Sequence, residues 1–345
     1  MSVQMNRRTL VKAGVGITAL GGLPGGAYVG SALAAESKVR LAFALRSAHQ
    51  SMLWLGTETG LFRKQGLEVS FPAMETGGPK AVAGLVSGDW DFCSTGTVPV
   101  AENFLNGGDV VALLRATLEH QLVFIAARRE LTTVGHLDGK RIGTTAESGS
   151  GQTGVILRLT LKKVGATATY VGMSGFESIY AALAKGEIDA GILPIHLRIS
   201  GEREHGWNIF ELASWEGGFV PSVFATTRKL IVSNRDLVMR TVRGVVETIH
   251  AFKTQPDVYI PLLQRFLNIS DRKVAEDLYK FYVPLFPQAP RVALAEGIQA
   301  LRSHFSQKYP AAQKLQESDF VDSSFIDELE QSGFIKRLYG GDARR

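Results

Sequence analysis

Cysteine is nearly absent from this sequence of 345 residues, because Cys93 is the only one. A single thiol cannot close a disulfide within the chain and supplies too few ligands for a thiolate zinc site. The seven histidines show neither H-E-x-x-H nor H-x-H spacing, so we predict no metal site and no other cofactor. The hydrophobic core must therefore stabilise the protein, and a chain of this length with 45% hydrophobic residues is long enough to form two domains.

The excess charge of one sign is also small. Thirty-eight Lys and Arg residues against thirty-three Asp and Glu residues give +5, and three of the bases lie in the first twelve residues. Residues 1–34 contain those three bases and no acid, so the rest of the chain has 35 bases, 33 acids and a net charge of +2. Bulk charge therefore gives no argument for a nucleic-acid partner.

The N-terminal segment lacks the uninterrupted apolar run of a membrane anchor. Its bases precede a glycine-rich run over residues 13–29, which is shorter than the roughly 20 apolar residues that a membrane span needs. Ala32-x-Ala34 then matches a signal-peptidase site, so we predict that residues 1–34 are an export signal. Asn6-Arg7-Arg8-Thr9-Leu10 resembles a twin-arginine signal, although Asn6 and Leu10 replace the usual Ser and Phe. No cysteine follows to carry a lipid, and we expect a free periplasmic protein.

Short β-branched and aromatic runs alternate with helical patterns from Val39 onward. This alternation predicts an α/β fold of βαβ units with mostly parallel sheets flanked by helices. A second series begins at Lys140–Thr144, and the chain is almost wholly helical after Val223–Thr227. We therefore predict a two-lobed clamp. The first lobe covers residues 36–126 plus 215–345, including a helical C-terminal extension, and the second covers residues 127–214.

An internal echo supports two related lobes. Ala83–Asp91 and Ala181–Asp189 share the pattern Ala-small-Leu-x-x-Gly-acid-x-Asp. Each segment fits a helix that ends at a left-handed glycine before a tight turn into a strand. Nine positions are weak support alone, because any unit of helix, glycine and strand uses the same residue types.

Two predicted helix starts are candidate anion sites. Gly149-Ser150-Gly151-Gln152-Thr153-Gly154 satisfies G-x-G-x-x-G, but no acid follows about twenty residues later to hold a ribose. Free N–H groups beside the hydroxyls of Ser148 and Ser150 instead suit a small anion, with a plain structural turn as the alternative. Ser94-Thr95-Gly96-Thr97 gives a matching start in the first lobe, where ordinary N-capping is nearly as good an explanation.

Other polar residues also follow predicted strands. Arg46, with Ser47, His49 and Gln50, follows the first strand, where a guanidinium could bind a carboxylate or sulfonate or simply face solvent. His196 follows the repeated strand at its ligand end, although a structural histidine is the simpler interpretation. Cys93 lies beside Phe92 on an apolar strand, which favours an inert thiol over a nucleophile. Trp215 is expected either to line the cleft or to pack at the hinge.

Four segments together closely resemble the solute-binding proteins of ABC importers for sulfonate, taurine, nitrate and thiamine precursors. They are Gly60–Val69, Gly88–Asp91, Leu137–Gly143 and Gly186–Gly191. The similarity runs from about Val39 to Phe325–Ile335. The resemblance implies a clamp whose ligand is held by loops after the strands, which correspond here to Arg46–Gln50, Ser94–Thr97, Ser148–Gly151 and Leu193–His196. These loops differ between ligand classes, so the substrate does not carry over.

We therefore predict the extracytoplasmic substrate-binding component of an ABC importer, a monomer that delivers a small sulfonate or carboxylate to an inner-membrane permease and catalyses nothing. The candidate ligand-binding residues are Arg46, Gln50, Ser94, Thr95, Thr97, Ser148, Gly149, Ser150, Gly151 and His196. Alternatives are a neutral thiamine-precursor binder, a receptor for a sensor, and a superfamily enzyme acting on a sulfur- or pyrimidine-containing substrate. The superfamily's thiamine-pyrimidine synthase has a cysteine cluster that this chain lacks. Its desulfinase has a nucleophilic cysteine where this chain has Arg46–His49.

Overall fold

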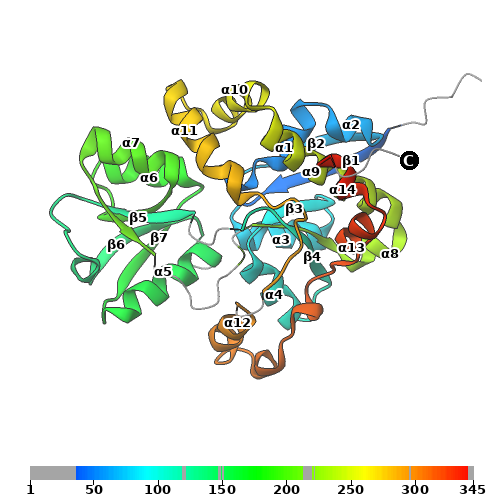
Figure 1. The fold of residues 1–345 in the computed structure, drawn as a ribbon. Coiled ribbons are helices and arrows are strands. Elements are labelled where there is room, and N and C mark those ends of the chain that lie inside the picture. The colour runs from blue at the N-terminus through cyan, green and yellow to red at the C-terminus, as the bar shows by residue number, and fades with distance from the viewer. Residues whose placement is uncertain are drawn as a thin grey trace, which may run out of the picture. The chain divides into compact units, whose positions relative to one another are not determined.

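The computed structural model describes residues 36–118, 122–146, 149, 151–212, 220, 222–294 and 297–340, which belong to one structural unit (Figure 1). Several predictions concern residues outside these ranges: the export signal over 1–34, the hydroxyls of Ser148 and Ser150, and the place of Trp215. Among the described residues, we find no helix with the length and apolar character that a bilayer crossing requires.

The first sheet has the strand order β2-β1-β3-β10-β4. Its strands are β1 (Ser37–Phe43), β2 (Leu67–Ala73), β3 (Phe92–Thr95), β4 (Val110–Arg115) and β10 (Val223–Thr227). β1 pairs in parallel with β2 and β3, whereas β10 is antiparallel to both β3 and β4. Four strands thus share one direction, and the chain returns to this sheet at β10, as predicted.

The second sheet has the order β7-β6-β8-β5-β9. Its strands are β5 (Val123–Ala127), β6 (Lys140–Thr144), β7 (Ala168–Gly172), β8 (Ala190–Pro194) and β9 (Asn208–Glu211). β6 is parallel to β7 and β8, whereas β5 is antiparallel to β8 and β9. The second sheet therefore repeats the topology of the first, with one antiparallel strand in the fourth place.

One strand assignment from the sequence was wrong. We placed the run ending at Ala126 in the first lobe, but β5 pairs only with strands of the second sheet among the described residues. All five residues of β5 are buried. A short strand that is apolar on both faces fits the interior of either sheet, so its composition does not indicate which sheet it joins.

Helices pack against both sheets. Before β5 they are α1 (Met52–Glu58), α2 (Leu61–Lys64), α3 (Gly78–Ser87) and α4 (Thr97–Leu105). The helices that lie between strands of the second sheet are α5 (Gln152–Lys163), α6 (Phe176–Ala184) and α7 (Ile195–His205). After β10 the chain is mainly helical, as predicted: α8 (Arg228–Ser233), α9 (Arg235–Thr254), α10 (Pro256–Leu267), α11 (Arg272–Tyr282), α12 (Gly297–Phe305), α13 (Ser324–Gln331) and α14 (Phe334–Leu338).

The 20-residue helix α9 holds this extension on the first sheet. Its buried residues include Val238, Val242, Val245 and Ile249, whose spacing of three and four residues puts them on one face. They join a hydrophobic cluster that also contains Leu41 of β1. Complete burial of one such side chain stabilises the fold by about 1.5–3 kcal/mol.

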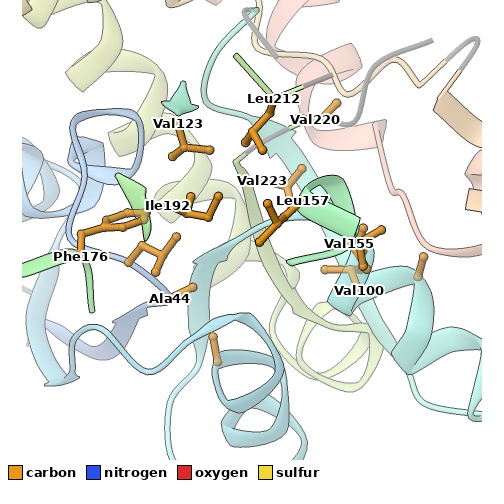
Figure 2. Packing of buried hydrophobic residues seen from close by; sticks show 14 of the residues in the cluster. Ala44, Val100, Val123, Val155, Leu157, Phe176, Ile192, Leu212, Val220 and Val223 are labelled. Carbon is orange, nitrogen blue, oxygen red and sulfur yellow. The ribbon is translucent and has the colours of Figure 1, made fainter. Parts of the chain in front are cut away.

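A second hydrophobic cluster contains residues from the elements of both sheets (Figure 2). Val100 of α4 and Val223 of β10 belong to it, as do Val155 of α5 and Ile192 of β8. Apolar packing therefore reaches the region where the two sheets' loops meet.

The predicted internal echo is confirmed by an equivalent contact in each sheet. Gly88 and Gly186, which follow α3 and α6, adopt φ values of 78° and 73°, the left-handed conformation that glycine tolerates best. The Asp91 carboxylate then accepts the backbone N–H of Arg40 at 2.8 Å. Likewise, the Asp189 carboxylate accepts the backbone N–H of Arg141 at 2.9 Å. Each aspartate therefore secures the turn to the neighbouring first strand of its own sheet.

Candidate functional site

Two neighbouring cavities lie where loops of the two sheets meet. The smaller, of about 40 Å³, is bordered by His49, Gln50 and Gly96 from the first lobe and by Gly151 and other residues of the second. The larger, of about 620 Å³, is lined by Glu75, Thr76, Gly77, Pro79, Lys80, Thr145, Ala146, Gly172, Met173 and Ser174. Thr145 and Ala146 border both cavities, so the two form one candidate cleft.

Gln152 bridges the two lobes beside the smaller cavity. From the first turn of α5, its Oε1 accepts the backbone N–H of Val98 at 3.4 Å, at the start of α4. The Thr97 hydroxyl donates to the same Oε1 (3.2 Å) or to the carbonyl oxygen of Val220 (3.3 Å). Gln152 Nε2 donates to that carbonyl at 3.1 Å. The α4 start that we predicted as an anion site is therefore partly capped by a side chain of the opposite lobe.

Gly96 permits this approach. A Cβ atom at position 96 would collide with the side-chain amide of Gln152. The group that approaches the Gly96 backbone so closely is therefore an amide of the protein itself.

His49 and His196 form a second meeting point of the lobes. His49 lies in a 3₁₀ turn after β1, and His196 lies in the first turn of α7. Each is only 3% exposed. Burial, with a smaller contribution from the charge of His196, lowers the pKa of His49 to about 3, and burial lowers the pKa of His196 to about 4. Both rings are therefore neutral at pH 7 and close enough to influence each other.

Both imidazoles have an unused nitrogen within the described part of the chain. The Ser47 hydroxyl lies 3.2 Å from His49 Nε2, but Nδ1 of His49 is buried without a hydrogen-bond partner. Nε2 of His196 is likewise buried and unpaired. A buried polar atom without a partner costs about 1–3 kcal/mol of stability. Such atoms in a native structure therefore need an explanation, and binding of a ligand is one.

Arg46 lies beside Glu75, a residue that lines the larger cavity. Its Nε is 3.8 Å from Glu75 Oε2, an ion pair too long for a hydrogen bond, and this buried Nε has no other partner among the described residues. Burial, together with the nearby charge of Glu75, raises the pKa of Glu177 to about 7, while Arg46 acts in the opposite direction. Glu177 is therefore partly protonated at neutral pH.

Glu75 also faces the second lobe. It adopts φ 62°, an unusual conformation for a residue with a side chain. A Cβ atom at Gly175, the N-cap of α6, would lie 2.9 Å from Glu75 Oε1. A carboxylate so close to a helix N-terminus is stabilised by the helix dipole. Glu75 thus supplies the protein's own anion at the start of α6.

The remaining predicted residues divide into two groups. The Thr95 hydroxyl is buried without a partner in the described chain, and Gly151 lines the smaller cavity. The Ser94 hydroxyl, by contrast, pairs with that of Ser222 at 3.1 Å. Gln50 lines the smaller cavity, but its Oε1 also accepts the backbone N–H of Leu45 at 3.1 Å. Ser94 is therefore already satisfied, whereas Thr95 is not.

The glycine motif has a structural explanation. A Cβ atom on Gly154 would collide with the backbone of Gly149, so only glycine lets α5 pack against its own preceding loop. The carbonyl oxygen of Gly149 accepts Arg158 Nη1 at 2.6 Å. These contacts explain the spacing without a nucleotide, while the two serines of the predicted anion site lie outside the described residues.

Cys93 is inaccessible. It is fully buried in β3, opposite Ala42 and Ala225, and burial raises the pKa of its thiol. A thiol in this environment is a poor nucleophile, as predicted. Within the described ranges, no group of three or more His, Cys, Asp or Glu side chains is arranged to hold a metal ion.

The sequence analysis did not identify Gln152, Glu75 or Glu177 as candidate site residues. It mentioned His49 but did not include it among the candidate ligand-binding residues. Gln152 was read only as part of the glycine motif, although its place after Gly151 at a helix start was a usable signal. Glu75 follows β2 and directly precedes Thr76-Gly77-Gly78, a turn-rich segment at the ligand edge of the sheet. Nothing in the sequence pairs Glu75 with Glu177, because they approach only through the fold.

Comparison with known proteins agrees with this architecture. A sequence model of the family described as NMT1/THI5 like matches residues 48–258, more than half of the chain. The comparison with curated protein sequences found no match to this chain.

Several solved structures share the fold at low sequence identity. The alkanesulfonate-binding protein SsuA from Xanthomonas axonopodis pv. citri, bound to MOPS, has a TM-score of 0.68 at 16% identity, over 83% of this chain and 98% of that one. The periplasmic aliphatic sulphonate binding protein SsuA from Escherichia coli has a TM-score of 0.61 at 16% identity, over 83% and 92%. The desulfurization enzyme DSZB has a TM-score of 0.56 at 16% identity, over 86% and 99%. These findings confirm the resemblance, and the chain therefore belongs to the NMT1/THI5-like family and has the two-lobed fold of periplasmic solute-binding proteins.

Proposed function

We propose that the protein is the extracytoplasmic substrate-binding component of an ABC importer and that it captures a small organic sulfonate or carboxylate in the cleft. Four buried polar atoms that lack partners within the described chain support this proposal: Arg46 Nε, His49 Nδ1, Thr95 Oγ1 and His196 Nε2. They lie at or just after the carboxyl ends of β1, β3 and β8, where ligands bind in open α/β sheets. A ligand that supplies the missing hydrogen bonds would favour closure of the lobes.

The charge balance in and beside the larger cavity favours an anion. Lys80 lines the cavity and Arg46 lies beside its lining residue Glu75, so both are positive groups near a ligand. Glu177, which senses the charges of both Glu75 and Arg46, carries only part of a negative charge because its pKa is about 7. Glu75 is partly neutralised by the helix dipole at the start of α6 and by Arg46. The two SsuA proteins with this fold bind sulfonates, according to their descriptions. A neutral thiamine precursor is the runner-up ligand because it would leave Arg46 less well satisfied.

A thermal-shift screen of sulfonates, carboxylates, nitrate, bicarbonate and neutral pyrimidines tests the ligand class. A ligand at 100 times its Kd stabilises the native state by about 2.7 kcal/mol, which raises the melting temperature by several degrees. Arg46→Ala should weaken binding of the active anion by about 1–3 kcal/mol. Arg129→Ala is the matched control, since Arg129 donates to His205 within the second lobe. A response to neutral pyrimidines alone, unchanged in Arg46→Ala, would contradict the proposal.

We also propose that the protein catalyses nothing. The fold includes a desulfurization enzyme, so this claim needs its own test. Cys93 is the only thiol and is fully buried. Cys93→Ser should therefore leave ligand affinity unchanged, and purified protein should not consume any ligand from the screen. Turnover that Cys93→Ser abolishes would instead establish an enzyme.

The proposed place of action is the periplasm, where a monomer would deliver its ligand to an inner-membrane permease. The N-terminal motif and the periplasmic description of one structural neighbour support this. Cell fractionation of the full chain should find it in the periplasm, and Arg7→Lys with Arg8→Lys should retain it in the cytoplasm if export uses the twin-arginine route.

A further inference from the structure

His49 and His196 offer neutral hydrogen-bonding groups, which the charged residues of the cleft do not. His49 and His196 come from different lobes, and each residue is 97% buried, since only 3% of its surface is exposed. Each keeps one ring nitrogen unpaired within the described residues. His49 lines the smaller cavity, whose border includes Leu45, Leu122 and Ile156. Two buried polar atoms without a partner need a hydrogen-bonding group, which a ligand in the neighbouring cavity would supply.

The described part of the cavity lining suits an uncharged partner. Among the described residues that line the smaller cavity none carries a carboxylate, so none of these residues would compensate an ammonium group. A second anionic group would meet no Lys or Arg among the described lining residues and would require a proton on an imidazole, which burial opposes. A hydroxyl or amide, in contrast, both donates and accepts, and a neutral imidazole provides either role through its tautomer.

Thr95 extends the same subsite. Its hydroxyl is fully buried and unpaired in the described chain, and a Cβ atom on Gly78, another residue lining the smaller cavity, would lie 3.2 Å from it. The small cavity volume of about 40 Å³ suits one compact group rather than a ring. The charged end of a ligand would remain in the larger cavity near Arg46.

We infer that His49 and His196 form, with Thr95, a neutral subsite that binds a hydroxyl or amide group on the far end of the anionic ligand. This inference rests on the proposed function and narrows its substrate class to anions that carry an uncharged hydrogen-bonding terminus. An anion with an apolar or ammonium terminus would bind less tightly.

Three isosteric probes test the subsite: 2-hydroxyethanesulfonate, propane-1-sulfonate and 2-aminoethanesulfonate. Calorimetry on the wild-type protein should give the hydroxyl compound an affinity about 3- to 10-fold above that of the methyl compound, the gain from one well-made hydrogen bond. The ammonium compound should be the weakest because its charge is desolvated without a counter-ion.

Two substitutions locate the effect. His49→Leu and His196→Leu should each abolish the preference for the hydroxyl compound while leaving the affinity for propane-1-sulfonate unchanged or higher. His136→Leu is the matched control, because His136 is exposed and hydrogen-bonds to the Thr132 backbone N–H at 3.2 Å. If either variant fails to fold, the wild-type ranking of the three probes still decides.

These experiments distinguish a failure of the proposed function from a failure of the neutral subsite. If no sulfonate or carboxylate binds, the proposed function fails and this inference with it. If sulfonates bind but the hydroxyl and methyl compounds bind equally, only the neutral subsite is wrong. If 2-aminoethanesulfonate bound most tightly of the three compounds, the inference would also be wrong. Its ammonium group would then be assigned to Glu75 and Glu177.

Discussion

The two lobes meet at two topologically equivalent crossings that differ in hydrogen bonding. In one, Gln152, at the start of α5 after β6 of the second sheet, bonds to the start of α4 after β3 of the first sheet. In the other, the loop after β1 of the first sheet brings His49 towards His196, after β8 of the second sheet. The first crossing is closed by the protein's own amide, whereas the second leaves nitrogen atoms unpaired in the described chain.

This difference separates closure from recognition. The hydrogen bonds of Gln152 hold the first crossing together, although the Thr95 hydroxyl beside it is unpaired in the described chain. Buried unpaired atoms, such as those of the histidine crossing, destabilise the closed form until another group satisfies them. We propose that the Gln152 crossing acts as a latch and that the histidine crossing is available for selection of the ligand.

Acid should act first on the histidine crossing, and this is the largest effect that we expect. The native pKa values of about 3 and 4 lie below the ordinary value near 6.5, so these rings contribute stability above pH 6.5. That contribution is lost as the pH falls, because the unfolded chain binds protons first. The free energy of unfolding should decrease by about 1.4 kcal/mol per pH unit for each ring, or up to about 4 kcal/mol for both between pH 6.5 and 5.

Urea denaturation at several pH values measures this loss. Glu177 opposes it, since a carboxyl whose native pKa is raised to about 7 stabilises the fold as the pH falls. Its opposing effect is smaller because the group is partly exposed to solvent. Glu177→Gln should therefore make the acid-induced loss steeper, and His49→Leu with His196→Leu should flatten it. Equal stability at pH 7 and pH 5 in the wild-type protein would show that the rings are not buried in solution.

Removal of the latch should have the next largest effect. Gln152→Ala deletes the side chain that joins α5 to Val98 and Val220, so the closed form should lose about 1–3 kcal/mol relative to the open form. Small-angle scattering without ligand should give a larger radius of gyration, and ligand affinity should decrease. Gln65→Ala is a matched control because Gln65 bonds to Glu247 at 3.0 Å within the first lobe. An unchanged scattering curve would remove Gln152 from this role.

Gly96→Ala sharpens the same test with Gln152 still present. The added methyl group would occupy the space of the Gln152 amide and should displace it. The expected loss is slightly smaller than that of Gln152→Ala, because the displaced amide regains hydrogen bonds to water. In a double-mutant cycle the two changes should not add, since both remove one contact. Additive losses would indicate that Gly96 acts elsewhere.

The duplicated aspartates should give the smallest effect. Asp91→Ala and Asp189→Ala each remove an acceptor for a strand N–H, at 2.8 Å and 2.9 Å. Thermal unfolding should show losses of about 0.5–1.5 kcal/mol in each case, with ligand affinity unchanged. If only one substitution weakened binding, the two sheets would differ in function at this position as well as at the crossings.

The sequence predicted repeated architecture better than contacts across the cleft. Alternating apolar runs and the Gly-x-x-Asp echo identify both sheets, because hydrogen bonding and burial impose local periods that any chain must satisfy. The sequence also named Thr95 and His196 as candidate ligand residues, and each has a buried polar atom without a partner in the described chain, while ligand binding by them stays a prediction. Loop position follows from topology alone.

Pairing between loops is not a local property. Gln152 and Val98 are distant in sequence, and only the packing of the two lobes makes the amide a helix cap. Ser94 resembled a ligand residue by its position, yet Ser222 satisfies its hydroxyl from the returning strand. The sheet of β5 was misassigned for the same reason, since an entirely apolar strand has no polar face to indicate its neighbours.

The place of β10 has a consequence for the order of folding. Every strand of the second sheet lies in the continuous segment from Val123 to Glu211, so that sheet can form without waiting for later parts of the chain. The first sheet needs β10 between β3 and β4, and the intervening chain must close a long loop before β4 is joined to the rest. Long-range pairing of this kind is slow, because loop entropy is lost before contacts are gained. The second lobe should therefore acquire protection from hydrogen exchange before β4 does.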